Sequence, residues 1–120
     1  MSEFVDIYHK GNALEQIDRK LAKLNFDRES ITLLKEFRRF LFLQGMSKYR
    51  ILKYFYTCVR LRQLLRKPFK QATKKDIMRV VEEIEKSNYA PWTKFNYKLV
   101  IKKFYKWLYT GSIDNTNYPE

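Results

Sequence analysis

Apolar residues recur every three or four positions along almost the whole 120-residue chain, and this spacing constrains the fold more than any other feature. The period is that of amphipathic α-helices, each burying one side of its surface. The chain has only three glycines and three prolines, too few for the many tight turns of a β-sandwich or barrel. Hydrophobic residues make up 45% and aromatic residues 17%, enough apolar material for one core. The sequence therefore predicts an all-α domain.

Residues that begin and end helices place the first two core helices. Asp27 or Ser30 offers the cap of a first helix, which Gly45 closes. A second helix runs from a Ser47 cap to about Lys67, because the next residue is a proline.

The last two core helices have equally clear starts. Thr73-Lys74-Lys75-Asp76 is a capping box, which predicts the beginning of a third helix. The fourth begins at Pro91, a residue favoured in the first turn, and runs to about Tyr109, shortly before Gly111. One additional amphipathic helix near the N-terminus follows from the helical spacing of Leu14, Ile17, Leu21 and Leu24.

The net charge of +12 is unevenly distributed. Residues 1–27 hold four basic and five acidic side chains, whereas residues 28–120 hold 21 basic and eight acidic ones. Residues 46–75 contain ten Lys or Arg and no acid, and residues 87–113 contain five Lys and no acid. Such blocks create a surface field that attracts polyanions. We therefore separate an N-terminal helical extension, 1–27, from a basic helical domain, 28–111, and a polar tail, 112–120.

On a helical wheel, both acid-free helices are basic on the side opposite their apolar residues. In the second helix the apolar arc includes Cys58, and the opposite arc carries Arg50, Lys53, Thr57, Arg60 and Lys67, with Tyr56 beside them. In the fourth helix Lys94, Lys98, Lys102 and Lys106 form a row at every fourth position, flanked by Tyr105 and Tyr109. Like charges in one row repel each other. The absence of an acid there favours an external polyanion as partner over a merely solvated face.

Residues with catalytic or ligand chemistry are scarce. His9 and Cys58 are the only histidine and cysteine, so no zinc-ligand set exists, and the three glycines stand too far apart for a phosphate loop. Glu82, Glu83 and Glu85 are interpreted as a solvated helix face. The single cysteine fits a reducing compartment, and the longest uncharged stretch, 40–47, is too short to span a bilayer. We expect no cofactor, no metal and no activity.

Three segments in succession, followed by the terminal NYPE, are similar to a known family: GMSKYRILKYFYTCVRLRQLL, ATKKDIMRVVEEIE and NYAPWTKFNYKLVIKKFYKWL. From about Arg28 to Glu120 the chain resembles the helical N-terminal, SAM-like core-binding domain of tyrosine recombinases, the phage-integrase family, and especially archaeal integrases. The resemblance implies a SAM-like four-helix domain, here with the additional N-terminal helix. It also implies that residues 112–120 lead toward a catalytic domain that this chain lacks.

In that family the domain grips one face of duplex DNA, and its second and fourth helices, which often open with Ser-x-x-Thr, face the major groove. Here Arg50 stands at the Thr position of the second helix, and Ala90 at the Ser position of the fourth. The family's catalytic Arg, Lys, His-x-x-Arg and Tyr have no counterpart, so the resemblance implies a recombinase parent but no enzyme in this chain. The candidate DNA-binding residues are Ser47, Lys48, Arg50, Lys53, Thr57, Arg60, Trp92, Thr93, Lys94, Lys98 and Lys102.

The expected partners are double-stranded DNA, contacted mainly through phosphates, and further protomers of the parent recombinase, without membrane or small-molecule substrate. The expected location is a prokaryotic cytoplasm, at the nucleoid when bound to DNA. Two other functions stay open. The basic face would also suit an acidic partner protein, and the aromatic side chains of Tyr56, Trp92, Tyr105 and Tyr109 would suit stacking on unpaired RNA bases.

Overall fold

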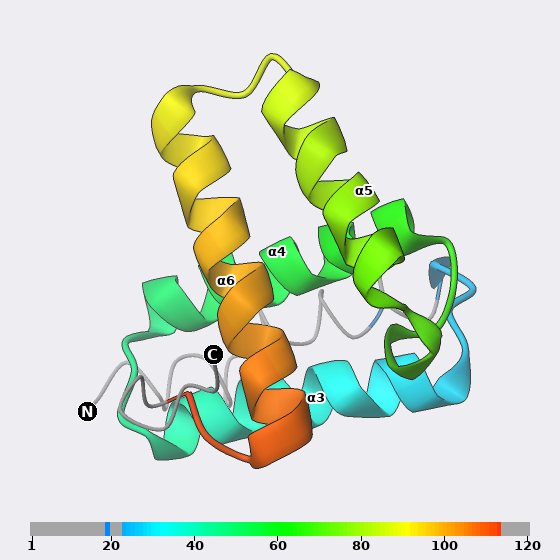
Figure 1. Cartoon of the computed structure of the whole chain (residues 1–120). Helices are drawn as coiled ribbons and strands as arrows, with labels where there is room; N and C mark the ends of the chain where they lie inside the picture. Colours follow the sequence, from blue (N-terminus) through cyan, green and yellow to red (C-terminus); the bar gives the residue numbers. More distant parts are fainter. Residues whose placement is uncertain (1–18, 20–22, 114–120) are drawn as a thin grey trace. The chain divides into compact units, whose positions relative to one another are not determined.

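The structure, a computed structural model, describes residue 19 and residues 23–113 (Figure 1). Within these residues it is all-α and has no strand. Its elements are α3 (Arg28–Leu43), α4 (Lys48–Leu65), the short 3₁₀ helix η1 (Phe69–Gln71), α5 (Lys74–Lys86) and α6 (Pro91–Thr110). The predicted all-α class and its four core helices are confirmed. The helix predicted over residues 14–24 and the end of the predicted tail lie outside the described residues, apart from residues 19, 23 and 24.

The chain divides into two units, Met1–Lys53 and Tyr54–Glu120, and the division falls within α4. No change of composition marks this position, because the same basic and apolar pattern continues along the whole helix. The boundaries predicted near residues 27 and 111 stay predictions.

In the first unit, α3 begins and ends where the sequence indicates. The Asp27 carboxylate accepts a hydrogen bond from the backbone N–H of Ser30 at 2.8 Å, which makes Asp27 the N-cap. Gln44 is the C-cap, and Gly45 follows with a φ of 79°, a left-handed conformation that glycine adopts without strain. The buried face of α3 consists of Ser30, Leu33, Leu34, Phe37 and Leu41.

In the second unit, α4 ends at Leu65, two residues earlier than predicted. Arg66 has a φ of 61°, and Lys67 precedes a proline, a position that disfavours helical backbone. The guanidinium of Arg79 donates to the carbonyls of Leu64 and Leu65 at 3.1 and 3.3 Å. A cation from α5 therefore satisfies carbonyl groups that the end of α4 leaves without helical partners.

The starts of α5 and α6 match their predicted signals. Thr73 Oγ1 accepts from the Asp76 N–H at 3.2 Å, and Asp76 Oδ2 accepts from the Thr73 N–H at 2.8 Å, which completes the capping box. Pro91 occupies the first turn of α6, and Gly111 caps its end with a φ of 78°. The two helices form an antiparallel pair joined by a short turn (Figure 1).

The η1 segment, which sequence analysis did not predict, holds the aromatic core of the second unit. Phe69 is fully buried, and its ring centroid lies 4.6 Å from that of Phe104 on α6. The hydroxyl of Tyr105 donates to the Phe69 carbonyl at 3.0 Å. One ring contact and one buried hydrogen bond thus fix η1 against α6.

Candidate nucleic-acid interface

The exposed side of α4 carries cations and aromatic rings together. Tyr49, Arg50, Lys53, Tyr56 and Arg60 are all exposed, at the three- and four-residue spacing that puts side chains on one face of a helix. No Asp or Glu occurs in α4. This face, Tyr49/Arg50/Lys53/Tyr56/Arg60, is named the α4 face below.

The prediction that Thr57 belongs to this surface is wrong. Its side chain is only 4% exposed. Thr57 lies one helical turn from both Tyr54 and Leu61, which are buried, so it sits at the edge of the buried side of α4 and not on its exposed side. The wheel position alone did not show how far packing extends around the helix.

The hydroxyl of Ser47, directly before α4, caps the start of this helix. Ser47 is exposed, and its Oγ accepts a long hydrogen bond of 3.4 Å from the Arg50 N–H, as an N-cap residue does. Lys48 is half-buried, with its ammonium group 5.3 Å from the ring centroid of Tyr49. The cation and the ring at the start of the α4 face therefore lie together.

The lysines of the α6 row differ in their surroundings, and not all of them are exposed. Lys98 Nζ lies 3.3 Å from a carboxylate oxygen of Glu85, and Lys94 Nζ donates to the Glu85 carbonyl at 2.7 Å. Lys106 is only 6% exposed, while Lys102 is exposed. Glu85 on α5 therefore supplies a counter-charge to Lys98, which the pattern of α6 alone did not indicate; an external polyanion as partner of the row stays a prediction.

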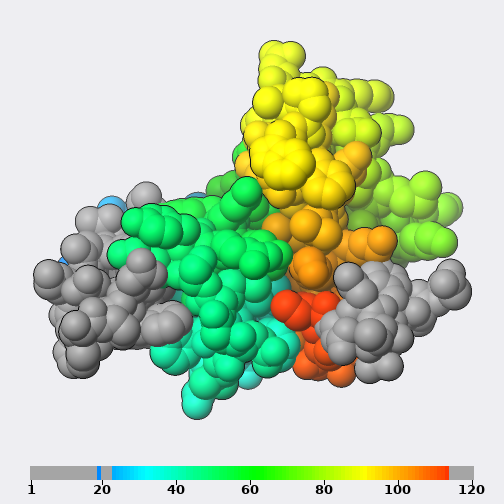
Figure 2. Space-filling model, turned by 90° about the vertical axis from the view of Figure 1, so that its left-hand side faces the viewer, coloured from blue at the N-terminus to red at the C-terminus, as the bar shows by residue number. Residues whose placement is uncertain are grey.

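The start of α6 presents an aromatic pair, half of which sequence analysis missed. Trp92 and Phe95 are 70% and 52% exposed, and their rings stack with centroids 5.5 Å apart and 18° between planes. Figure 2 shows the first turns of α6, in yellow, at the surface. Thr93, predicted to contact DNA, is half-buried beside them. Phe95 lies three residues after Trp92, a spacing that predicts such a pair.

The two tyrosines expected to flank the lysine row have different environments. Tyr105 is buried and donates to a backbone carbonyl, and burial raises the pKa of its hydroxyl. Tyr109 is 65% exposed, and its ring stacks on the ring of Tyr105 with the two centroids 6.0 Å apart. Only Tyr109 of the two is therefore accessible for stacking on a ligand.

Within the second unit the charge of Arg60 acts on the hydroxyl of Tyr97 on α6. Burial and the neighbouring Tyr89 raise the pKa of Tyr97 on α6, while the Arg60 guanidinium opposes this rise. Of the other predicted residues, Trp92, Thr93, Lys94, Lys98 and Lys102 lie together on α6 in this unit, and Ser47, Lys48, Arg50 and Lys53 belong to the first unit.

Other reactive chemistry is limited in the part of the chain that the structure describes. No group of three or more His, Cys, Asp or Glu is arranged to hold a metal ion among the residues described. Cys58 is buried, as predicted, and burial raises the pKa of its thiol, which disfavours the nucleophilic thiolate. No helix within residues 23–113 has the length and apolar character required to cross a membrane.

Comparison of the chain with models of protein families, with curated proteins and with solved structures finds no match.

Proposed function

We propose that this chain binds duplex DNA through the α4 face, with exposed side chains of α6, among them Lys102, as a second contact. The observation that carries the proposal is the α4 face itself, where Arg50, Lys53 and Arg60 are exposed on the same side as Tyr49 and Tyr56, on a helix without any acid. A helix of this kind suits the phosphates and the major groove of DNA. The net charge of +12 adds long-range attraction.

Within this interface the side chains have different roles. Lys53, Arg60 and Lys102 position the protein on phosphates, which gives affinity without sequence preference. Arg50, near the start of α4, has the fork of donors that matches a guanine edge or a phosphate. The resemblance to the core-binding domain of tyrosine recombinases supports the same two helices. On that basis the parent protein is a site-specific recombinase in which this chain is the non-catalytic half of a DNA clamp.

The test is a salt titration of duplex binding with matched charge reversals. Lys53→Glu combined with Arg60→Glu is expected to reduce the magnitude of the slope of log K against log salt by about two, because two phosphate contacts are lost. Lys75→Glu combined with Lys86→Glu, two exposed positions on α5, makes the same change of charge outside the proposed interface. Equal losses from both pairs would show that only net charge matters and would overturn the proposal.

A second candidate function is binding of single-stranded nucleic acid, and the stacked pair of Trp92 and Phe95 specifically favours it. Exposed aromatic rings beside cations are the platforms on which unpaired bases stack. If this function is correct, Trp92→Ala weakens binding of single-stranded RNA or DNA more than binding of duplex. Duplex preference that is unchanged by Trp92→Ala would exclude it.

The reading frame of the parent gene gives an independent check of the recombinase proposal. A His-x-x-Arg segment and a later Tyr encoded after Glu120 would supply the catalytic residues that the family requires. A stop codon at that point would instead favour a separate binding protein, including one whose basic face docks an acidic protein partner.

A further inference from the structure

Three helices of the described chain are followed by a residue with a left-handed backbone, and one of these residues is not glycine. Gly45 after α3 and Gly111 after α6 have φ values of 79° and 78°, whereas Arg66 after α4 has a φ of 61°. Asn25, the other non-glycine residue with this conformation among those described, belongs to a type that tolerates it. Glycine adopts this backbone freely, but a residue with a Cβ is strained in it. The end of α4 therefore carries a strain that glycine would remove.

The side chain of Arg66 is not needed to complete the end of α4. The Arg66 N–H donates to the Arg62 carbonyl at 3.2 Å, a backbone bond that any residue except proline can make. The carbonyls of Leu64 and Leu65 accept hydrogen bonds from Arg79, so α5 already supplies a cation to this helix end. The Arg66 charge adds its attraction to the negative end of the helix dipole, which is weak at an exposed position.

The charge of Arg66 is not neutralised by nearby acids. No Asp or Glu occurs in residues 46–75. The first acid beyond this stretch, Asp76, accepts from Lys67 at 3.0 Å and from the Thr73 N–H at 2.8 Å. Arg66 is exposed and forms no ion pair within residues 23–113, and Lys70 on η1 is exposed as well. The field at the end of α4 is therefore strongly positive and open to solvent.

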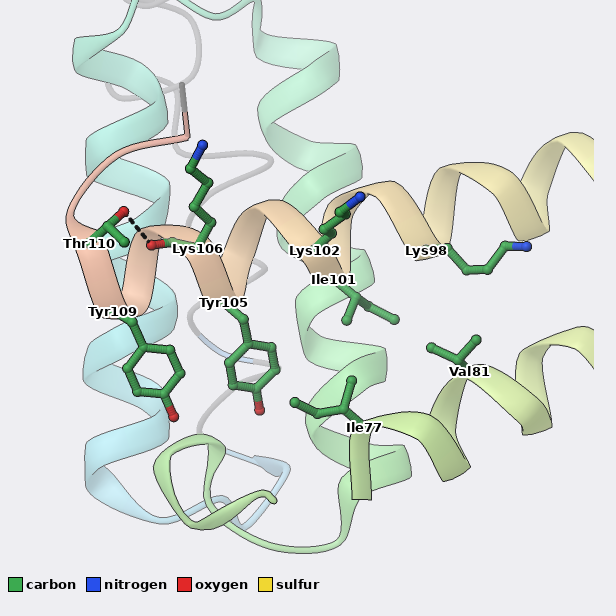
Figure 3. Close-up of a pocket in the computed structure, with 9 residues that line it drawn as sticks. All are labelled: Ile77, Val81, Lys98, Ile101, Lys102, Tyr105, Lys106, Tyr109 and Thr110. Carbon is green, nitrogen blue, oxygen red and sulfur yellow. Dashed lines mark hydrogen bonds between the residues drawn. The ribbon is translucent and has the colours of Figure 1, made fainter. Parts of the chain in front are cut away.

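Other cations of the second unit are less accessible to a polyanion. Lys98 lies beside Glu85, and Lys106 is buried. In Figure 3 the side chains of Lys102 and Lys106 extend from α6 on the side away from α5. The cavity of about 510 Å³ between these helices is lined mainly by apolar side chains, among them those of Ile77, Val81 and Ile101 (Figure 3). Neither this cavity nor Lys98 and Lys106 therefore offers a phosphate the exposed cation that Arg66 does.

We infer that Arg66 contacts a DNA phosphate, and that the fold is less stable for having an arginine at this position. The inference rests on the proposed function and extends the interface to the end of α4. Arg66 follows Arg60 by six residues, which is about 9 Å along a helix axis. The major groove is about 12 Å wide, so both cations can meet phosphates that border one groove. A guanidinium binds phosphate through two parallel hydrogen bonds whatever the base sequence, so Arg66 adds affinity without specificity.

Three substitutions of Arg66 separate its charge from its strain. Arg66→Ala removes the cation and keeps the strain, Arg66→Gly removes both, and Arg66→Lys keeps both. In a salt titration of duplex binding by the full chain, Arg66→Ala and Arg66→Gly are expected to reduce the magnitude of the slope by about one and to weaken binding at least about threefold at low salt. Arg66→Lys is expected to keep the slope. In urea, Arg66→Gly is expected to have an unfolding equilibrium constant at least about threefold smaller than that of Arg66→Ala.

Lys75→Ala is the matched control, because it removes one charge at an exposed position of α5 outside the proposed interface. Unchanged duplex binding by Arg66→Ala would overturn the inference, and so would an equal loss in Lys75→Ala, which would reflect net charge alone. Arg66→Gly less stable than Arg66→Ala would overturn the argument from strain. A slope reduced by Lys53→Glu with Arg60→Glu but not by Arg66→Ala would leave the interface in place and exclude Arg66 from it. Failure of the proposed function differs from this, because the wild-type chain itself would then show no salt-dependent duplex binding.

Discussion

The two basic helices, α4 and α6, look alike in sequence and differ in the folded chain. Both lack acids, and both place lysines or arginines at helical spacing. On α4 the side chains of Arg50, Lys53 and Arg60 are exposed, whereas on α6 Lys98 is half-buried beside Glu85 and Lys106 is buried. The charge pattern of one helix therefore shows where its own cations lie, but not whether acidic side chains of a neighbouring helix lie beside them. Counter-charges can come from a neighbouring helix, and these decide how much of the field reaches a ligand.

The largest expected effect concerns the side of α6 that packs inward. Phe104 is fully buried against Phe69, so Phe104→Ala is expected to lower the free energy of unfolding by about 3–5 kcal/mol. Trp92→Ala, at an exposed position of the same helix, is expected to change it by only about 0.5 kcal/mol or less. Urea denaturation of the two variants measures the difference. Similar losses would mean that the aromatic pair at the start of α6 is part of the core.

The second prediction compares the two helices directly in duplex binding. Lys98→Glu with Lys102→Glu is expected to reduce the magnitude of the salt slope by about one, because Lys98 already has a carboxylate partner. The corresponding pair on α4, Lys53→Glu with Arg60→Glu, is expected to reduce it by about two. The salt titration proposed above measures both. A larger effect of the α6 pair would reverse the assignment of the main contact.

Helix limits were predictable because local chemistry sets them. The Asp27 cap, the Thr73–Asp76 capping box, Pro91 and Gly111 act where the sequence indicates, since each satisfies or avoids backbone groups within a few residues. The end of α4 differed by two residues, because Arg66 adopts a left-handed conformation that no nearby glycine signals. The η1 helix was missed because its position depends on the buried partners of Phe69.

The site was less predictable because it depends on distant parts of the chain. The sequence indicates which face of α4 is basic, but the burial of Thr57 depends on how far packing extends around that helix. The pairing of Lys98 with Glu85, 13 positions earlier in the chain, depends on the antiparallel arrangement of α5 and α6. The cavity between these helices also required both walls to be placed. No periodicity in either helix alone indicates it.

The third prediction uses a cation just beyond α4. Lys67 Nζ lies 3.0 Å from Asp76, and the pKa of Asp76 is lowered from its ordinary 3.8 to about 2, first by the Thr73 N–H and then by Lys67. The folded state thus favours the ionised carboxylate, so its contribution to stability is complete above about pH 4 and is lost as the pH falls toward 2. The free energy of unfolding, measured as a function of pH, should show this loss. Asp76→Asn should remove the part of the acid-dependent loss that comes from this carboxylate.

A cap variant tests how much the Thr73 hydroxyl contributes to the same capping box. Thr73→Ala removes the Oγ1 acceptor of the Asp76 N–H and is expected to lower the free energy of unfolding by about 1 kcal/mol at neutral pH. The same substitution removes the 3.0 Å hydrogen bond that Thr73 Oγ1 donates to Asp76 Oδ2, whereas the carboxylate keeps its bond from the residue 73 N–H and its pair with Lys67. Thermal unfolding should therefore show lower stability with an acid-dependent loss still present. Loss of the acid dependence would mean that the threonine hydroxyl controls the carboxylate.

The smallest effect is expected from a substitution that removes the acidic partner of a lysine on α6. Glu85→Gln removes the carboxylate beside Lys98 but leaves the Glu85 backbone carbonyl that Lys94 contacts. The pair is partly exposed, so the stability cost is expected to be only about 0.2–1 kcal/mol. Duplex binding should become tighter by a small factor, with a steeper salt slope, because Lys98 becomes able to contact a phosphate. Glu82→Gln makes the same change on α5 but removes the partner of Lys86 instead, and is the control. If Glu82→Gln tightens binding as much as Glu85→Gln, the general field of α5 and not the pairing of Lys98 distinguishes α6 from α4.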